Sequence, residues 1–329
     1  MTSPTKITLH FAHANGFPAG SYQQVFKELP DDFEVHALTK FAHSQRFPVN
    51  ANLSNQVAEL VDHLEHKVTK PAYVVGHSMG AVVSFMAACE RPDLIKGVIM
   101  LDPPIASGLA RIVFRLLKCS PLIDKFSPAG KAKVRCQSWP LGTNLVAYFK
   151  GKALFKNFKL ESIQDYVSSV IDERDGKLQL NFDAQIEASI YRNVPHNINQ
   201  FYQRLSVPGL LVTGSHSDVC IPSLLGTFVK KSKIEHLIFK DGGNLGVFLD
   251  ELKVGDSAMV DIVNQSGKND RELSQRVRRD AVGMVVKRRG HAPLGHFLLA
   301  TRFNWSYDPR QQLRDGHCDM RGVLKVVKR

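Results

Sequence analysis

The sequence lacks the features that mark several classes of protein. Its five cysteines are odd in number, widely spaced and without a Cys-x-x-Cys pair, so neither a disulfide framework nor a structural zinc site is predicted. No basic segment followed by an apolar stretch precedes the first apolar run, which argues against a secretory signal peptide. We therefore expect a cytoplasmic protein with reduced thiols and no metal or other cofactor.

The chain also lacks a long apolar run of the kind that spans a membrane. Residues 72–89 contain no Asp, Glu, Lys or Arg, but a spanning helix needs about 20 apolar residues. Gly76, His77, Ser78 and Gly80 interrupt the middle of this run. A buried strand, a tight turn and a buried helix explain it better.

Negative charge is scarce in one part of the chain. The formal net charge is +12, from 43 Lys and Arg against 31 Asp and Glu. Residues 105–160 contain eleven Lys or Arg and one acid, Asp124, and residues 250–329 contain sixteen basic and ten acidic residues. Such asymmetry predicts a surface that attracts anions.

Buried-strand and helical patterns alternate along the first hundred residues. The predicted strands are Ile7 to His13, Phe33 to Leu38, Tyr73 to Val75 and Gly97 to Leu101, and the predicted helices are Leu53 to Val68 and Ser78 to Glu90. This alternation is typical of an α/β fold with a doubly wound, mostly parallel sheet.

The alternation stops after Pro103-Pro104 and resumes about a hundred residues later. The intervening residues 105–203 are basic, aromatic and mostly helical in character, which predicts a helical cap inserted into the core. A strand at Gly209 to Gly214, a helix at Pro222 to Lys231 and a strand at Glu235 to Phe239 then restore the core pattern. We therefore expect core segments at 1–104 and 204–243, the cap between them, and an atypical basic segment at 244–329.

The strongest functional signal is Gly76-His77-Ser78-Met79-Gly80, a Gly-x-Ser-x-Gly pentapeptide between an apolar strand and an apolar helix. A serine on such a turn projects its hydroxyl above the sheet, because the flanking glycines let strand and helix approach closely. The helix N-terminus behind it offers free N–H groups to a developing oxyanion. This pattern predicts Ser78 as a nucleophile.

With these residues the chain resembles the α/β-hydrolase superfamily over about residues 5 to 243. The segment His13-Ala14-Asn15-Gly16-Phe17 is similar to the family's oxyanion loop, and the resemblance implies backbone N–H donors at Phe17 and Met79. The loop Gly214-Ser215-His216-Ser217-Asp218 is similar to the family's acid loop, which implies Asp218 as the triad acid.

Three other polar residues near these motifs have alternative interpretations. Asp102 also ends a core strand and is the competing acid, although a Leu-Asp-Pro-Pro segment more often caps a turn. His77 and His13 are expected to pack and to form hydrogen bonds rather than to act as bases.

The catalytic histidine is not found where the resemblance places it. Family members carry it after the last strand, commonly following Gly-Gly, whereas this chain has Asn244 after Gly242-Gly243. An asparagine amide cannot act as a general base. Three explanations stay open: a reading-frame change or fusion near this point, a base supplied by His291, His296 or His317, or a binding protein that kept the fold and lost the chemistry.

A serine nucleophile predicts hydrolysis of carboxylic esters or thioesters through an acyl-enzyme. Aromatic and basic residues in the cap predict an apolar ester substrate with an anionic group, and weak contact of the cap with anionic lipid. No nucleic-acid motif accompanies the basic stretches, so a nucleic-acid partner is not expected. The alternative function is a catalytically impaired or inactive hydrolase-fold protein.

Overall fold

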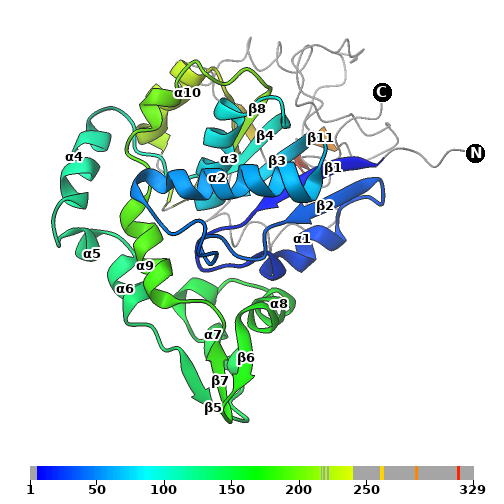
Figure 1. The fold of residues 1–329 in the computed structure, drawn as a ribbon, viewed down its shortest axis with the longest axis vertical. Helices are drawn as coiled ribbons and strands as arrows, with labels where there is room; N and C mark the ends of the chain where they lie inside the picture. The colour runs from blue at the N-terminus through cyan, green and yellow to red at the C-terminus, as the bar shows by residue number, and fades with distance from the viewer. Residues whose placement is uncertain are drawn as a thin grey trace, which may run out of the picture.

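A computed structural model describes residues 6–215, 217, 219–220 and 222–239, and three short strands further along the chain (Figure 1). Its centre is a seven-stranded sheet in the order β10-β9-β8-β4-β3-β1-β2. The strands are β1 (Ile7–Ala12), β2 (Phe33–Ala37), β3 (Ala72–His77), β4 (Ile95–Leu101), β8 (Gly209–Gly214), β9 (Glu235–Phe239) and β10 (Val260–Ile262). Six strands run parallel, and only β10 is antiparallel to its neighbour β9. The predicted mostly parallel sheet is confirmed.

Helices flank this sheet (Figure 1). They are η1 (Ala19–Tyr22), α1 (Gln23–Lys27), η2 (Ala51–Leu53), α2 (Ser54–His63), η3 (Leu64–Val68), α3 (Met79–Glu90) and α10 (Pro222–Ser232). Every residue of α3 except Glu90 is buried, as expected for a helix that is apolar on all sides. Helix α3 packs on α2, β3 and β4, so the turn that precedes it is fixed between the central strand and a buried helix.

A long insertion separates β4 from β8. It contains α4 (Gly108–Lys118), α5 (Ile123–Phe126), α6 (Ala129–Lys133), α7 (Leu145–Lys150), η4 (Ala153–Phe155), α8 (Leu160–Val170), α9 (Ala184–Asn193) and η5 (Ile198–Phe201). It also contains a three-stranded antiparallel sheet, in the order β5-β7-β6, formed by β5 (Ser138–Pro140), β6 (Ile171–Arg174) and β7 (Lys177–Leu180). The insertion is mostly helical, and its small sheet was not predicted from the sequence.

A two-residue turn explains the unexpected sheet. Asp175 and Gly176 join β6 to β7, and both have positive φ, +51° and +67°. This geometry matches the right-handed twist of a tight hairpin, and Asp-Gly is among the pairs that adopt it most readily. The two-residue turn thus favours a hairpin at this point, although the sequence around it has helical periodicity.

The cap has its own aromatic core. Phe149, Phe155 and Tyr166 are buried in it together with Trp139. The ring of Phe17, from the loop after β1, packs against this cluster, with its centroid 5.1 Å from that of Tyr166. The loop after β1 is therefore fixed to the cap as well as to the sheet.

Within the described residues, no helix is long and apolar enough to cross a bilayer. Cys89, Cys119, Cys136 and Cys220 are free thiols. In the predicted C-terminal segment 244–329, the structure describes β10 and a separate two-stranded sheet. That sheet is formed by β11 (Val286–Lys287) and β12 (His317–Cys318).

Candidate active site

Ser78 occupies the strained turn that the sequence predicts. It lies between β3 and α3 with φ 52° and ψ −116°, and its N–H donates to the carbonyl of Leu101 on β4 at 2.8 Å. A positive φ is uncommon for a residue with a side chain, and such strain is held only where the surroundings over-determine it. Ser78 is partly exposed, whereas its neighbours His77 and Met79 are buried.

The two glycines of the pentapeptide are required by close backbone contacts. A Cβ on Gly76 would lie 2.3 Å from the carbonyl oxygen of Gly80, and a Cβ on Gly80 would lie 2.1 Å from the carbonyl oxygen of Ala12. Neither distance is tolerable for a carbon atom against backbone. The glycines therefore let α3 approach both its own strand and the end of β1, which brings Ser78 next to the loop that follows β1.

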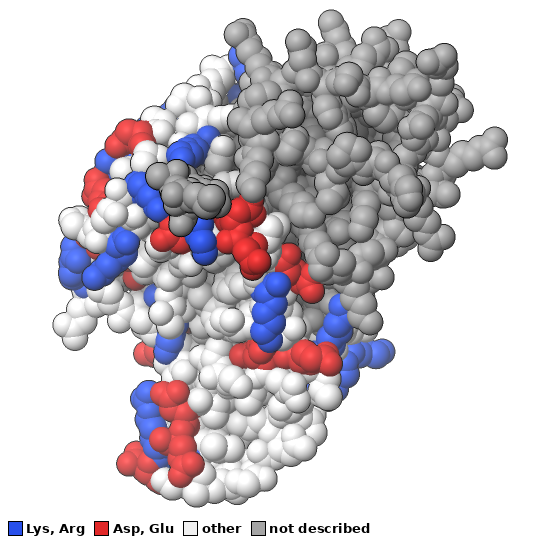
Figure 2. Space-filling model, turned by 90° about the vertical axis from the view of Figure 1, so that its right-hand side faces the viewer, with Lys and Arg blue, Asp and Glu red and all other residues white. Residues whose placement is uncertain are grey.

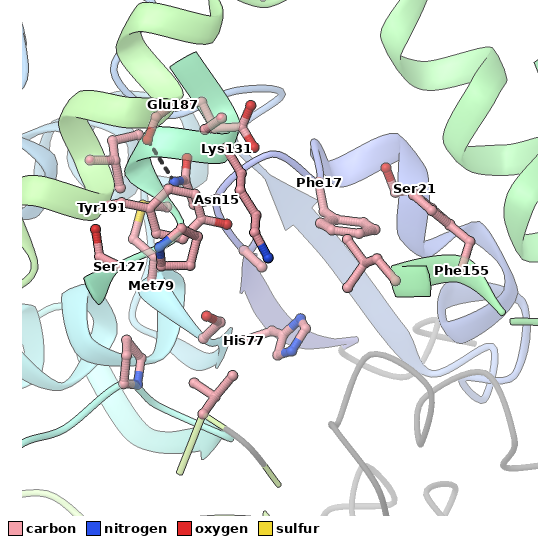
Figure 3. Close-up of a pocket in the computed structure, with 18 of the residues that line it drawn as sticks. Asn15, Phe17, Ser21, His77, Met79, Ser127, Lys131, Phe155, Glu187 and Tyr191 are labelled. Carbon is pink, nitrogen blue, oxygen red and sulfur yellow. Dashed lines mark hydrogen bonds between the residues drawn. The ribbon is translucent and has the colours of Figure 1, made fainter. Parts of the chain in front are cut away.

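Ser78 opens into a cavity of about 1260 Å³ between the core and the cap. Phe17 and Met79 line the same cavity, so three of the predicted site residues meet there (Figure 3). Much of the remaining wall is aromatic, contributed by the cap residues Phe114, Phe126, Trp139, Phe149 and Phe155. A concave site with a largely aromatic wall and several polar side chains is typical of a small-molecule site.

The loop after β1 forms a tight turn that uses the N–H of Phe17. This group donates to the carbonyl of Ala14 at 3.1 Å, and Gly16 has φ +74°, as the third residue of a type II turn requires. The N–H of Phe17 is thus engaged inside the loop, which does not favour it as an oxyanion donor. The N–H of Asn15 has no acceptor among the described residues, and Asn15 lines the cavity with Ser78.

The side chain of Asn15 also ties this loop to the cap. Its Nδ2 donates to the carbonyl of Glu187 on α9 at 2.9 Å (Figure 3). Met79, at the first position of α3, supplies a second backbone N–H, since the first N–H groups of a helix have no intrahelical acceptor. The sequence reasoning missed Asn15, although the glycine after it indicates a turn that engages the following N–H.

His13 and His77 are both committed to structural hydrogen bonds. Nδ1 of His13 lies 2.8 Å from the carbonyl oxygen of Ala14, and its Nε2 accepts the N–H of Phe41 at 3.0 Å. Nδ1 of His77 lies 2.8 Å from the hydroxyl of Tyr22. Burial lowers the pKa of each imidazole to about 4, so both rings are neutral near pH 7.

Asp102 stands at the end of β4 with φ +48° and is buried. Its carboxylate accepts the hydroxyl of Ser217 at 2.7 Å, and that hydroxyl oxygen in turn accepts the N–H groups of Val219 and Cys220. Asp102 does not line the cavity. This arrangement makes Asp102 an anchor for the loop around residue 218.

An ion pair between the partly exposed Arg135 and the buried Glu187 joins three segments of the cap. Arg135 donates to Glu187 on α9 at 2.8 Å and to the hydroxyl of Tyr166 on α8 at 3.0 Å. Nearby, Lys131 extends into the cavity with no acidic partner among the described residues (Figure 3). The cavity therefore combines aromatic walls with two lysines, Lys131 and Lys152, that have no acidic partner among the described residues.

Several predicted site residues lie outside the described residues. They are the acid Asp218 and the candidate bases His291 and His296, together with the side chain of His317, whose backbone is in β12. Asn244, at the position expected for the histidine, also lies outside. Within the described chain, His77 is the only histidine that lines the cavity.

Comparison with known proteins agrees with this geometry. The family model "Alpha/beta hydrolase family" matches residues 11–298. The chain belongs to the alpha/beta hydrolase family. This hydrolase is 33% identical over 102 residues to the uncharacterized hydrolase YugF of Bacillus subtilis, covering 30% of this chain and 37% of that protein. It is 25% identical over 142 residues to the monoglyceride lipase homolog of Monkeypox virus, covering 38% and 49%.

The match to these curated relatives spans less than half of their length. Among solved structures, the peroxisomal alpha-beta-hydrolase Lpx1 of Saccharomyces cerevisiae has the same fold. It superposes with a TM-score of 0.58 at 17% identity, covering 73% of this hydrolase and 71% of that chain. A likeness at this identity concerns the fold alone, so the chemistry of this hydrolase has to be argued from its own residues.

Proposed function

We propose that this hydrolase cleaves carboxylic esters or thioesters through an acyl-enzyme on Ser78. The observation that carries the proposal is the position of Ser78: a serine held at positive φ, partly exposed at a large apolar cavity, at the N-terminus of a buried helix. Met79 and Asn15 line the same cavity, and we propose their backbone N–H groups as the oxyanion donors. Such donors stabilise the charge that develops on a carbonyl oxygen under attack.

The proposed reaction has two steps. Oγ of Ser78 bonds to the carbonyl carbon and gives its proton to a base, the carbonyl oxygen becomes an oxyanion against Asn15 and Met79, and the alcohol or thiol leaves with that proton. Water then attacks the acyl-serine, its proton passes through the same base to Oγ, and the carboxylic acid is released.

The base in this scheme is not among the described residues. Nδ1 of His77, the one described histidine in the cavity wall, lies 2.8 Å from the hydroxyl of Tyr22, and burial lowers the pKa of this ring to about 4. We propose Asp218 as the acid that orients the base, with His291, His296 and His317 as the candidates for the base itself.

The walls of the cavity support an apolar acyl chain with an anionic group as the substrate class. The aromatic cap residues cover the acyl chain in this proposal, and Lys131 meets the anionic group. Arg135 is less suited to that task, because Glu187 and Tyr166 already accept its hydrogen bonds. An anion beside Lys131 gains from the low polarity of its surroundings.

Labelling with a fluorophosphonate tests the proposal. The full chain is expected to react at Ser78, and Ser78→Ala is expected to abolish labelling. Ser127→Ala is the matched control, because Ser127 also lines the cavity but lies on a cap loop. Loss of labelling in only one of the variants His291→Ala, His296→Ala or His317→Ala would identify the base. Labelling that survives Ser78→Ala would contradict the assignment.

One observation favours a second candidate, a hydrolase-fold protein with impaired or no catalysis. Asn244 stands at the position expected for the histidine, and burial lowers the pKa of the only described histidine in the cavity wall to about 4, which makes it a weak base. In this case Ser78 has no activating base. Fluorophosphonate labelling of the folded chain no faster than that of the urea-unfolded chain would support this second candidate.

A further inference from the structure

Helix α4 presents its apolar stripe to solvent. Leu109, Ile112, Val113 and Leu116 recur at spacings of three and four residues, which places them on one side of the helix. Their exposed fractions are 80%, 47%, 56% and 67%. Two further exposed apolar residues, Leu122 and Phe126, follow in the next segment. We call the four residues of α4 the docking face.

Polar contacts on the other side of α4 fix this orientation. Arg111 donates to Oδ1 of Asn199 at 2.9 Å, and Nζ of Lys118 donates to the carbonyl of Val194 at 2.9 Å. Phe114, between them, turns into the cavity. The charged residues therefore point toward the body of the protein, and rotating the helix to bury its leucines would break both contacts and expose Phe114.

Exposed cations lie on α4 and on the two helices that follow it. Arg115 and Lys125 have no acidic partner among the described residues, and Lys133 lies near Asp124. Asp124, the only acid in residues 105–160, is bound by Arg192 through two hydrogen bonds of 2.6 Å. By contrast, the face shown in Figure 2, turned away from α4, carries acidic and basic side chains beside one another.

We propose that the docking face binds an anionic lipid surface. An exposed apolar stripe next to Lys and Arg is the arrangement by which a helix lies in the interface of an anionic bilayer. A second copy of this chain is a poorer partner, because its own docking face would bring the same positive charge. The inference goes beyond the proposed reaction and does not need Ser78 to be active.

Docking on lipid would also orient the cavity. Phe114 on α4 and Phe126 on α5 both line it, so the docking face lies on the structure that walls the cavity. A protein bound through α4 would hold this wall against the bilayer.

Binding to vesicles tests the proposal. The full chain is incubated with phosphatidylcholine vesicles and with vesicles of equal parts phosphatidylcholine and phosphatidylglycerol, and bound protein is measured by flotation. Leu109→Ser/Leu116→Ser is expected to weaken binding to the anionic vesicles at least about tenfold. Leu160→Ser makes the same kind of substitution at one exposed leucine of α8, away from the docking face. This control is expected to bind as the parent does.

The charges are tested separately. Arg115→Gln and Lys125→Gln are each expected to weaken binding to anionic vesicles about fivefold, because one basic residue near such a surface contributes about 1 kcal/mol. Lys96→Gln, at an exposed lysine of β4, is the control. Circular dichroism verifies that each variant is folded.

Three results would overturn the inference. They are equal binding of the parent to the two kinds of vesicle, equal binding of Leu109→Ser/Leu116→Ser and Leu160→Ser, and a dimer in sedimentation that the docking-face variant abolishes. The last result would assign the face to a second copy. Ser78→Ala is expected to bind vesicles normally, so a failure of the proposed reaction and a failure of docking are distinguishable.

Discussion

The hydroxyl of Tyr22 lies 2.8 Å from Nδ1 of His77 and accepts the N–H of Ala14 at 3.2 Å. One buried hydroxyl therefore connects the loop after β1 to the residue before Ser78. Burial lowers the pKa of His77 to about 4, so the imidazole beside this hydroxyl is neutral near pH 7. The contact holds the two segments of the proposed oxyanion site together and engages Nδ1 of His77.

Removing this hydroxyl is expected to destabilise the protein. Tyr22→Phe leaves the N–H of Ala14 and Nδ1 of His77 without partners, which costs about 1–3 kcal/mol in the free energy of unfolding. Urea unfolding measures the change. Tyr73→Phe is the control, since the Tyr73 hydroxyl makes no hydrogen bond within the described chain, and a loss equal to that of Tyr22→Phe would contradict the account.

The glycine at position 80 is expected to tolerate no side chain. Gly80→Ala places a Cβ 2.1 Å from the carbonyl oxygen of Ala12, so α3 must move away from β1. We expect a loss of at least about 3 kcal/mol in thermal or urea unfolding, as for other severe overpacking in a core. Gly226→Ala on α10 meets no atom within 4 Å and should be neutral or stabilising by up to about 1 kcal/mol. Similar stabilities of the two variants would refute the close contact.

The ion pair between Arg135 and the buried Glu187 is expected to contribute more to the free energy of unfolding than an exposed ion pair does. Arg135→Met leaves the Glu187 carboxylate buried without its cation, at a cost of about 3 kcal/mol. Arg174→Met removes the exposed pair with Asp172 and should cost less than about 1 kcal/mol. Urea unfolding compares them, and the double variant Arg135→Met/Glu187→Met should recover part of the loss. Equal losses would mean that the cap pair is screened by water.

Glu59 is expected to make stability depend on pH. Burial raises the pKa of this carboxyl to about 7, although it accepts the N–H of Ala42 at 2.8 Å. The folded protein therefore holds a proton that the unfolded chain releases near pH 4.5. The resulting contribution of Glu59 to the free energy of unfolding is fully present below pH 4.5 and is lost as the pH rises through 7. Glu59→Gln keeps an acceptor for Ala42. Relative to this variant, the free energy of unfolding of the parent should fall by up to about 1.4 kcal/mol per pH unit between pH 4.5 and 7.

Buried histidines change the free energy of unfolding with pH in the opposite direction, so the parent is compared with Glu59→Gln. The pKa of His13, His77 and His236 is lowered to about 4, so their contribution is lost as the pH falls below 6.5. These groups are common to the parent and Glu59→Gln, and their effect cancels in the difference. A difference that does not change between pH 4.5 and 7 would contradict the pKa of Glu59.

The sequence predicts the core of this hydrolase closely. The strands Gly209–Gly214 and Glu235–Phe239 have their predicted bounds, and α3 begins one residue after the predicted start. These elements are buried, and buried strands and helices are recognisable in the sequence as continuous apolar runs. The position of Ser78 follows for the same reason, since the glycines beside it are needed by backbone contacts that any such turn makes.

The cap and the oxyanion loop are harder to predict. In the cap, periodicity indicates helices, and the hairpin at Asp175-Gly176 depends on a two-residue turn signal that helical spacing hides. In the loop after β1, the direction of each N–H depends on the turn that Gly16 forms, which residue order alone does not give. The outward apolar stripe of α4 follows the expected period, but only its contacts at Arg111 and Lys118 reveal which side faces solvent.

The acyl-enzyme itself is the most direct test of the proposed function. The full chain is mixed with p-nitrophenyl hexanoate, quenched with acid, and analysed by peptide mass spectrometry. The account predicts one hexanoyl group on the peptide that contains Ser78, a burst of nitrophenolate, and neither in Ser78→Ala. An unmodified Ser78 under saturating ester, or a hexanoyl group on another residue, would contradict it.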